Sequence, residues 1–403
     1  MPQTARWTDL VPHRSWLLSE ADGLLRFFEA SVIDPKGGFF TLDRQGNPRE
    51  AEAFRALHDT TRLVHCFALA ELMGRPGAGV IVEHGLDFLR QAHRDPHLGG
   101  FAWLADTTGN RSGRKTAYGH AFVLLAASTA QLAGHDSSDI LKEVTEVIDT
   151  RFWEEGPGAV TEEFELDWTP LPDYRGQNCN MHMTEALMAA YEATGKVGYL
   201  QKAERIAALI IHRHARAYDW RVVEHFTADW RPDTTYDGDP MFRPAGITPG
   251  HGLEWVRLLV QLYRTGGGSQ DWMIEAARGL FARATQDGWD KENGGLVYTT
   301  DFNGAPLVAE RYWWPVCEGI GAAHALRGLD DGAEDWYRRF WDFAATRLID
   351  RPHGGWFPQL DATGAPSEDP FFGKPDLYHA LQACLVPLWP VEGSVARHLL
   401  GRA

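Results

Sequence analysis

The sequence predicts an all-α protein in which six helical hairpins close into an (α/α)6 barrel, with short β-hairpins in the loops. Two observations predict this fold: helical periodicity along most of the 403 residues, and a glycine-rich motif that recurs about every 60 residues. Apolar residues at three- and four-residue spacing are typical of amphipathic helices. The expected helices cover residues 15–32, 52–73, 78–93, 116–133, 138–152, 180–195, 198–216, 251–265, 270–286, 313–327, 333–348 and 375–388.

The loops between helix pairs carry a motif of two glycines, alternating apolar residues, an aspartate and a glycine-containing turn. This pattern predicts a short β-hairpin. The first glycines of the clear copies are residues 37, 99, 294 and 354, so the intervals are 62, 195 and 60 residues. The long interval leaves room for two degenerate copies, which we place near Gly156 and Tyr218. The clear copies read KGGFFTLDRQGNP, LGGFAWLADTTGN, NGGLVYTTDFNGAP and HGGWFPQLDATGAP.

Six units of two helices can form either an open solenoid or a closed toroid. An open array needs polar outer faces on its terminal units, whereas the terminal units of this chain are as apolar as the others. No linker or low-complexity stretch interrupts the helices. We therefore expect one closed domain that spans residues 1–403.

The stretch ITPGHGLEWVRLLVQLY, residues 247–263, shows how one of these helices is specified. Thr248 is a candidate N-cap, and Pro249 suits the first helical turn. Apolar residues recur at helical spacing after Leu253. Because residues three apart lie on the same helical face, His251 and Glu254 present two polar groups together at the start of an otherwise apolar helix.

A conspicuous polar residue recurs at a similar phase in the first helix after each hairpin. In a closed toroid, equivalent positions on the inner helices surround one central cavity, so these residues predict a polar pocket. Four of the six are histidines, the side chain best suited to proton transfer near neutral pH. For His120, a supporting role in the wall fits equally well. The six residues are Arg62, His120, His182, His251, Glu318 and His379.

The composition argues against several classes of partner. The formal net charge of −16 argues against nucleic acid and anionic membrane, because both attract basic surfaces. No apolar run approaches the roughly 20 residues of a membrane span, and the first residues lack the apolar core of a signal peptide. Cys66, Cys179, Cys317 and Cys384 form no CxxC pair, which predicts free thiols in a reducing compartment. We expect a cytoplasmic protein.

Two rival interpretations use the same polar residues. His182 with Glu185 and His251 with Glu254 form two His-x-x-Glu pairs, a donor set that suits iron, manganese or zinc. Arg62 opposes a divalent cation at that place, so we expect no metal and no cofactor. A glycosidase needs two carboxylates across the cleft, and Glu254 could act with Glu318 or Asp376. A sugar-binding protein without catalysis is a further alternative.

Four motifs identify a family resemblance: NCNMHMTEA, ITPGHGLEW, RYWWPVCEG and GKPDLYHALQACL. In collinear order from Trp16 to Pro390, the chain resembles the N-acylglucosamine 2-epimerase superfamily, and within it the aldose–ketose isomerase branch. The resemblance implies an (α/α)6 barrel and metal-independent conversion of an unmodified hexose, D-mannose to D-fructose, through a cis-enediol. D-lyxose is a further expected substrate, and a sugar 2-epimerase is the nearest alternative.

The resemblance also implies which residues act. The catalytic histidines of the family fall on His251 and His379. We assign the transfer of a proton from C2 to C1 to His379 and ring opening to His251, although these roles are interchangeable at this point. Arg62 is expected to stabilise negative charge on the sugar oxygens, and Glu254 to orient His251 or bind a hydroxyl. The remaining residues expected to bind the sugar are Tyr118, Asn178, His182 and Trp314.

The expected partner is therefore a monosaccharide, with the chain acting as a monomer or homodimer. Isomerases of a sulfonated sugar in the same branch tend to carry glutamines where this chain has Pro358 and Pro375. Fewer polar groups at those positions favour an unsubstituted hexose.

Overall fold

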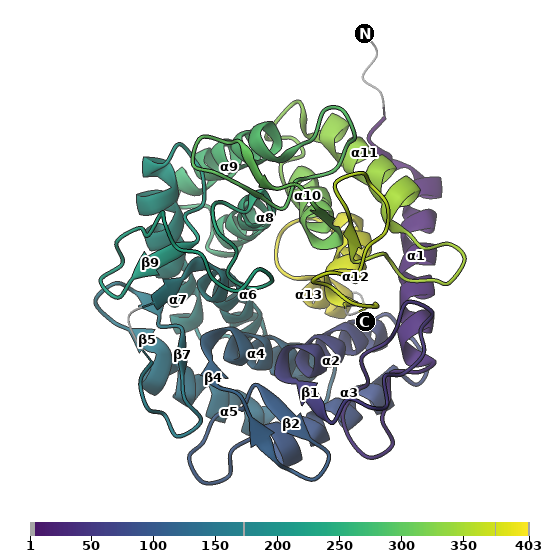
Figure 1. Ribbon diagram of the computed structural model, residues 1–403, viewed down its shortest axis with the longest axis vertical. Helices are drawn as coiled ribbons and strands as arrows, with labels where there is room; N and C mark the ends of the chain where they lie inside the picture. The colour runs from purple at the N-terminus through teal and green to yellow at the C-terminus, as the bar shows by residue number, and fades with distance from the viewer. Residues whose placement is uncertain (1–4, 172–173, 375, 402–403) are drawn as a thin grey trace.

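The computed structural model describes residues 5–171, 174–374 and 376–401, and it confirms the predicted (α/α)6 barrel. Figure 1 shows two concentric rings of helices around a central opening. All twelve expected helices are present, in order. The expected helix at 375–388 begins with Pro375, which lies outside the described residues, and its described part starts at Tyr378. The inner ring comprises α2 (Leu57–Leu72), α4 (Ala117–Leu132), α6 (Gln177–Thr194), α8 (Pro249–Thr265), α10 (Trp313–Ala325) and α12 (Tyr378–Leu385).

The outer helices each pack against one inner helix, and the ring closes where α12 contacts α2. The first helix of the chain completes the ring as the outer partner of α12, the last inner helix. Four outer helices continue into π-helical turns, η2 (Leu89–His93), η3 (Ile148–Phe152), η4 (Ala208–Ala215) and η5 (Ala344–Leu348). The outer helices are α1 (Val11–Glu29), α3 (Ala78–Phe88), α5 (Ser138–Val147), α7 (Gly198–Ala207), α9 (Trp272–Gly288) and α11 (Ala333–Phe343).

Short antiparallel strands link consecutive loops at one face of the barrel. The strand that precedes an inner helix pairs with the loop of the next unit, as in β1–β2, β4–β7, β8–β9 and β12–β13. The strands are β1 (Phe54–Ala56), β2 (Leu104–Asp106), β3 (Arg111–Ser112), β4 (Lys115–Thr116), β5 (Trp153–Glu154), β6 (Ala159–Val160), β7 (Glu163–Phe164), β8 (Tyr174–Gly176), β9 (His225–Thr227), β10 (Thr299–Thr300), β11 (Pro306–Val308), β12 (Arg311–Tyr312) and β13 (Gln359–Leu360).

The repeated glycine pair is explained by the backbone it must adopt. Gly99 and Gly100 have φ of 73° and 77°, in the left-handed region that favours glycine. In the degenerate unit near Tyr218, Asp219 and Trp220 hold the same backbone, with φ of 56° and 63°. That unit therefore keeps the turn without the glycines that mark it in the sequence.

The opposite end of the barrel is filled by the C-terminal segment. The short turn η6 (Val386–Leu388) leads to α13 (Val395–Leu400), which contacts α2 and α4 inside the ring. The sequence did not predict α13, and a 3₁₀ turn η1 (Trp7–Asp9) precedes α1. The four cysteines are buried and free. None of the described helices is long and apolar enough to cross a membrane.

Candidate functional site

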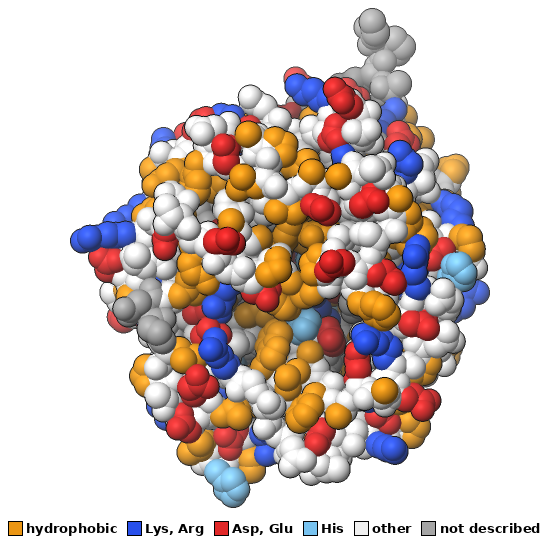
Figure 2. Space-filling view, in the orientation of Figure 1, with side chains coloured by type: hydrophobic (Ala, Val, Ile, Leu, Met, Phe, Trp, Pro, Cys, Tyr) orange, Lys and Arg blue, Asp and Glu red, His pale blue; other side chains and the backbone are white. Residues whose placement is uncertain are grey.

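A cavity of about 260 Å³ opens at the face that carries the loops. Figure 2 shows this hollow at the centre of the molecule, with hydrophobic side chains around it and a histidine side chain exposed inside it. The volume lies just below the roughly 300–1,000 Å³ of pockets for drug-sized ligands, as suits a smaller molecule. The cavity is lined by His58, Asp59, Arg62, Trp103, Tyr118, Asn178, His182, Met241, Phe242, His251, Glu254, Tyr298, Trp313, Trp314, Phe371, Phe372, Asp376 and His379.

All six inner helices begin at this cavity. His58, Tyr118, Asn178, His251, Trp314 and His379 lie in the first turns of α2, α4, α6, α8, α10 and α12. Helix N-termini carry partial positive charge, so six of them around one cavity favour a ligand that develops negative charge. The fold therefore supplies electrostatic stabilisation before any charged side chain is considered.

His251 is oriented by a carboxylate that we did not predict. Its Nδ1 lies 2.9 Å and 3.0 Å from the two carboxylate oxygens of Glu224, so Nδ1–H donates to Glu224. The amide of Gln177 donates to the same carboxylate at 2.8 Å and accepts from the indole N–H of Trp255 at 2.8 Å. Burial alone would raise the pKa of Glu224, but His251 holds it below its usual value. Because Nδ1 is engaged, Nε2 is the nitrogen left for a ligand.

Of the two roles expected for Glu254, the orientation of His251 is therefore wrong, whereas the binding of a hydroxyl stays a prediction. Glu224 lies 27 residues before His251, in the degenerate hairpin, where the glycine signal is weakest. A signal was nevertheless present: Glu224 is a charged residue that directly follows the apolar pair Val222 and Val223, all three of which are buried.

His379 is held in the same way from the other side of the cavity. Its Nδ1 donates to Glu318 at 2.9 Å, and the second oxygen of Glu318 accepts from Arg257 at 3.2 Å. Its backbone N–H donates to Asp376 at 2.9 Å. Glu318 was expected to line the cavity, but it lies behind His379 and fixes that ring.

Trp314 lies close to both histidines. Its ring centroid lies 5.0 Å from that of His251 and 5.9 Å from that of His379. Gly250 allows this approach, because a Cβ at that position would lie 2.6 Å from the indole. Two histidines with carboxylate-bound Nδ1 thus flank one aromatic face, an arrangement suited to proton transfer at two positions of a bound molecule.

Arg62 supplies the fixed positive charge. Its guanidinium donates to Tyr118 Oη at 2.9 Å and to Asp376 at 3.3 Å, and it lies over the rings of Phe122 and Tyr378 at 4.5 Å and 5.0 Å. Burial alone would lower the pKa of Arg62, but these oxygen neighbours raise it. The arginine is therefore a permanent cation at the cavity wall.

Several polar atoms at the cavity have no hydrogen-bond partner among the described residues. They include His182 Nδ1, Asn178 Oδ1 and both carboxyl oxygens of Glu254. Burial lowers the pKa of His182 to about 4, so the imidazole is neutral near pH 7. Burial raises the pKa of Tyr118 to about 12. Buried polar groups without partners are costly, and hydroxyl groups of a ligand would satisfy them.

His120 does not line the cavity. It is fully buried, Nδ1 contacts the carbonyl oxygen of Thr116 at 2.8 Å, and Nε2 accepts from the N–H of Phe101 at 3.1 Å. The prediction that all six polar residues in phase face the cavity is thus wrong for His120 and for Glu318, whereas the supporting role considered for His120 fits these contacts.

The donors for the metal alternative are only partly assembled. His182, Glu185 and Glu254 each place one ligand atom within 4.8 Å of the others. Arg257 already pairs with Glu185 at 3.1 Å and lies 3.6 Å from Glu254. The carboxylates thus face a protein cation where a metal would have to enter, and His251 turns to Glu224 instead. For the glycosidase alternative, Asp376 is bound to Arg62, and Glu318 lies behind His379. Of the other two carboxyl groups in the described lining, Asp59 lies 3.0 Å from His58 Nε2 and Glu254 lies 3.6 Å from Arg257.

If His251 transfers protons, substitution of Glu224 by glutamine is expected to lower kcat by about 10²-fold or more, because a neutral amide no longer fixes the tautomer of His251. The fold should survive, since glutamine keeps the size of the side chain. Steady-state kinetics and thermal unfolding of E224Q check this. The matched change Glu163→Gln, at a carboxylate outside the cavity lining, should leave kcat unchanged. Wild-type turnover by E224Q would contradict the role of Glu224.

Comparisons with known proteins agree with this geometry. The family model of N-acylglucosamine 2-epimerase (GlcNAc 2-epimerase) matches residues 37–383. The chain is 41% identical to a D-mannose isomerase of Pseudomonas cannabina pv. alisalensis, over 98% of this chain and 97% of that protein. It is also 41% identical to a D-mannose isomerase of Thermobifida fusca, over 97% and 98%. A crystal structure of D-mannose isomerase superposes with a TM-score of 0.87 at 33% identity, over 93% of this chain and 97% of the other.

Proposed function

The chain belongs to the N-acylglucosamine 2-epimerase family, and from this premise we propose that it is an aldose–ketose isomerase that interconverts D-mannose and D-fructose. The observation that carries the proposal is the pair of histidines, His251 and His379, both close to Trp314 in one cavity. Each has its Nδ1 bound to a buried glutamate, which leaves Nε2 for the substrate. D-Lyxose, which has the same configuration around C2 and C3, is a further expected substrate.

The reaction moves one hydrogen from C2 to C1. The ring form must first open, which requires a proton at the ring oxygen and a base at O1. A base then removes the C2 proton, O1 gains a proton and a cis-enediol forms. The return of a proton to C1 and the loss of one from O2 give the ketose. Each step needs a group that both accepts and donates protons near neutral pH, which is the chemistry of histidine.

His379 carries the proton between C2 and C1 in this scheme, and His251 opens the ring and exchanges protons with the oxygens. Arg62 stabilises the negative charge that develops on O1 and O2, together with the six helix N-termini. Trp314 stacks on the C–H face of the sugar. The scheme uses protein side chains alone as reacting groups and requires no metal.

The remaining cavity residues hold hydroxyl groups. Burial and the nearby carboxylates of Glu318 and Glu185 raise the pKa of Glu254 well above its usual range, so the neutral acid can donate a hydrogen bond. Asn178 Oδ1 accepts one, and neutral His182 and Tyr118 complete the set. These groups offer both donors and acceptors, as sugar hydroxyls require.

An unsubstituted sugar is favoured over a sulfonated or phosphorylated one. Among the described lining residues, Arg62 is the one arginine or lysine, and Asp376 and Tyr118 already engage it. Pro358 is buried, and its carbonyl oxygen accepts from the N–H of Trp313 at 3.2 Å. Pro375 lies outside the described residues. The chain is expected to act as a monomer or homodimer.

Proton NMR of the purified protein with D-mannose in D₂O, with EDTA present, tests the proposal. Fructose that carries deuterium at C1 is the expected product. Glucose labelled at C2 as the main early product would instead indicate a 2-epimerase. Heat protection by mannose without any ketose would indicate a sugar-binding protein, and loss of turnover in EDTA that zinc or manganese restores would overturn the metal-free reaction.

A further inference from the structure

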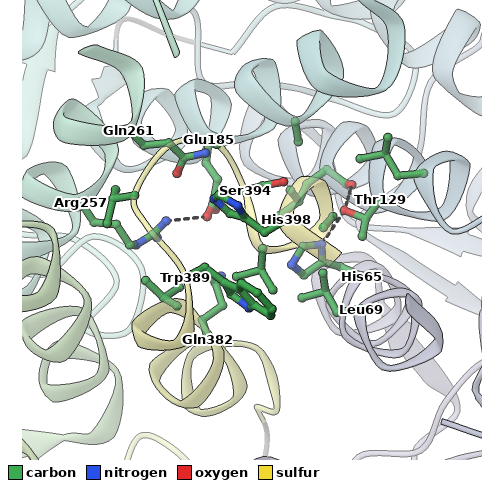
Figure 3. Close-up of a pocket in the computed structure, with 18 of the residues that line it drawn as sticks. His65, Leu69, Thr129, Glu185, Arg257, Gln261, Gln382, Trp389, Ser394 and His398 are labelled. Atoms are coloured by element: carbon green, nitrogen blue, oxygen red, sulfur yellow. Dashed lines mark hydrogen bonds and ion pairs between the residues drawn. The ribbon is translucent and has the colours of Figure 1, made fainter. Parts of the chain in front are cut away.

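A buried ionic cluster lies directly beneath the proposed sugar cavity. Arg257, on α8, is only 4% exposed and does not line that cavity. Its guanidinium donates to Glu318 on α10 at 3.2 Å and to Glu185 on α6 at 3.1 Å, and it lies 3.6 Å from Glu254. Figure 3 shows Arg257 and Glu185 joined across a small second pocket, which the C-terminal segment closes from below.

Two continuous chains of contacts lead from Arg257 up to the cavity. The first runs through Glu318, whose other oxygen accepts from His379 Nδ1 at 2.9 Å. The second runs through Glu185, which accepts a hydrogen bond from Tyr378 Oη. The ring of Tyr378 in turn lies 5.0 Å below the guanidinium of Arg62. One buried arginine is thus linked to two of the three groups to which we assign catalysis.

The charges around Arg257 fit this arrangement. Burial alone would raise the pKa of Glu318 and of Glu185, but Arg257 is foremost among the neighbours that lower both. Glu318 therefore stays anionic and accepts the Nδ1–H of His379. The third carboxyl, Glu254, has its pKa raised instead. One guanidinium thus keeps two of three crowded carboxyl groups ionised.

We propose that Arg257 is a positioning residue for the reaction: it holds His379 through Glu318, and Arg62 through Glu185 and Tyr378, from outside the sugar cavity. This inference rests on the proposed function, because it concerns how the same two groups are held. A positioning role for Arg257 differs from a purely structural role in its consequences. Loss of positioning changes turnover and its pH dependence, whereas loss of stability alone does not.

Gly321 offers a test that leaves Arg257 in place. A Cβ at Gly321, on the neighbouring α10, would lie 3.1 Å from Arg257 Cδ, so Gly321→Ala must displace the arginine by a few tenths of an ångström. Alanine favours a helix more than glycine does, so the Tm should be unchanged or higher. We expect kcat to fall about 10-fold, since small misplacements of catalytic groups are costly. Gly23→Ala is the matched control: its Cβ would have no neighbour within 4 Å, and kcat should not change.

Substitution of Arg257 itself separates charge from geometry. Arg257→Met removes the cation that faces Glu318, Glu185, Glu254, Tyr378 and, through Glu318, His379. Loss of this cation makes a proton on any of these side chains harder to remove. The acidic limb of the pH profile of kcat/KM should therefore move to higher pH by about one unit. Arg257→Lys keeps the charge but cannot contact both carboxylates in the geometry of a guanidinium. The acidic limb of this variant should therefore stay at the wild-type pH, while its kcat should lie between those of Arg257→Met and the wild type. Arg264→Met, on the same helix but outside the cluster, should change neither.

A spectroscopic readout keeps this inference distinct from the proposed function. With ¹⁵N-labelled histidine, the Nδ1–H of His379 should give a downfield proton signal that H379N removes. This signal should shift or broaden in G321A and weaken in R257M, whether or not the protein isomerises mannose. If G321A keeps wild-type kcat and an unchanged signal, Arg257 is a stabilising residue only and the inference is overturned. If the acidic limb of the kcat/KM profile lies at the same pH in R257M as in the wild type, the proposed effect of the Arg257 charge is overturned.

Discussion

Replacement of His379 by alanine is expected to lower kcat by about 10²- to 10⁴-fold, the usual cost of removing a general acid or base. The structure gives the reason: Nδ1 of His379 donates to Glu318 at 2.9 Å, which leaves Nε2 for the substrate in the cavity. Removal of the ring takes away the group that we propose carries the proton between C2 and C1. Steady-state kinetics with D-mannose measure the loss, and circular dichroism establishes that the fold is kept.

The two histidines can be told apart by an isotope effect. With C2-deuterated mannose, H379A should retain or increase the effect, because proton removal becomes slower still. H251A should lower kcat by a similar factor of about 10²- to 10⁴-fold but suppress the isotope effect, because ring opening then limits the rate. The opposite pattern would exchange the two assignments. His214→Gln is the control: His214 is a buried histidine on the outer ring, against Phe226, and its loss should lower the Tm without changing kcat.

Arg62 gives the second large effect. Arg62→Met should lower kcat by about 10²- to 10³-fold, the usual cost of removing one preorganised donor from a developing oxyanion. KM should change much less, because neutral mannose carries no charge for the guanidinium to bind. The kcat of Arg62→Lys should lie between those of the wild type and Arg62→Met, because lysine keeps the charge but loses the paired contacts to Tyr118 and Asp376.

Binding of a charged mimic separates this electrostatic role from packing against Phe122 and Tyr378. The Kd of a linear sugar hydroxamate, which imitates the enediolate, should rise in R62M by about the same factor as kcat falls. The Kd of D-mannitol, a neutral open-chain analogue, should stay within a few-fold of the wild type. Equal losses for both ligands would mean that Arg62 only shapes the cavity.

The fold was largely predictable because both of its signals are local. Apolar periodicity located the helices, and the glycine pairs located the turns, since a left-handed backbone leaves a mark in the sequence at Gly99 and Gly100. The unit with Asp219 and Trp220 shows the limit of that signal. Its backbone makes the same left-handed turn as Gly99 and Gly100, but without glycines. The helix α13 is too short to give a clear period and depends on contacts with α2 and α4.

The candidate site was predicted less well, because phase along a repeat does not fix the direction of a side chain. His120 lies two residues after the cavity residue Tyr118, which is about 200° around a helix, so it points into the wall. Glu318 lies four residues after Trp314, one turn deeper into the barrel, and therefore meets His379 from behind. Glu224 was missed because it lies in the degenerate unit, directly before β9, and its partner His251 is 27 residues away.

The closure of the ring between α12 and α2 has a consequence for how the protein is made. The cavity takes residues from all six inner helices, so no contiguous part of the chain holds a complete site. During synthesis the units emerge in order. Arg62 and His379, to which we assign catalytic roles, are separated by more than 300 residues. The last inner helix carries His379 and also completes the ring. Activity should therefore arise in a single late event, when α12 docks between α10 and α2. The step that closes the barrel is then also the step that completes the active site.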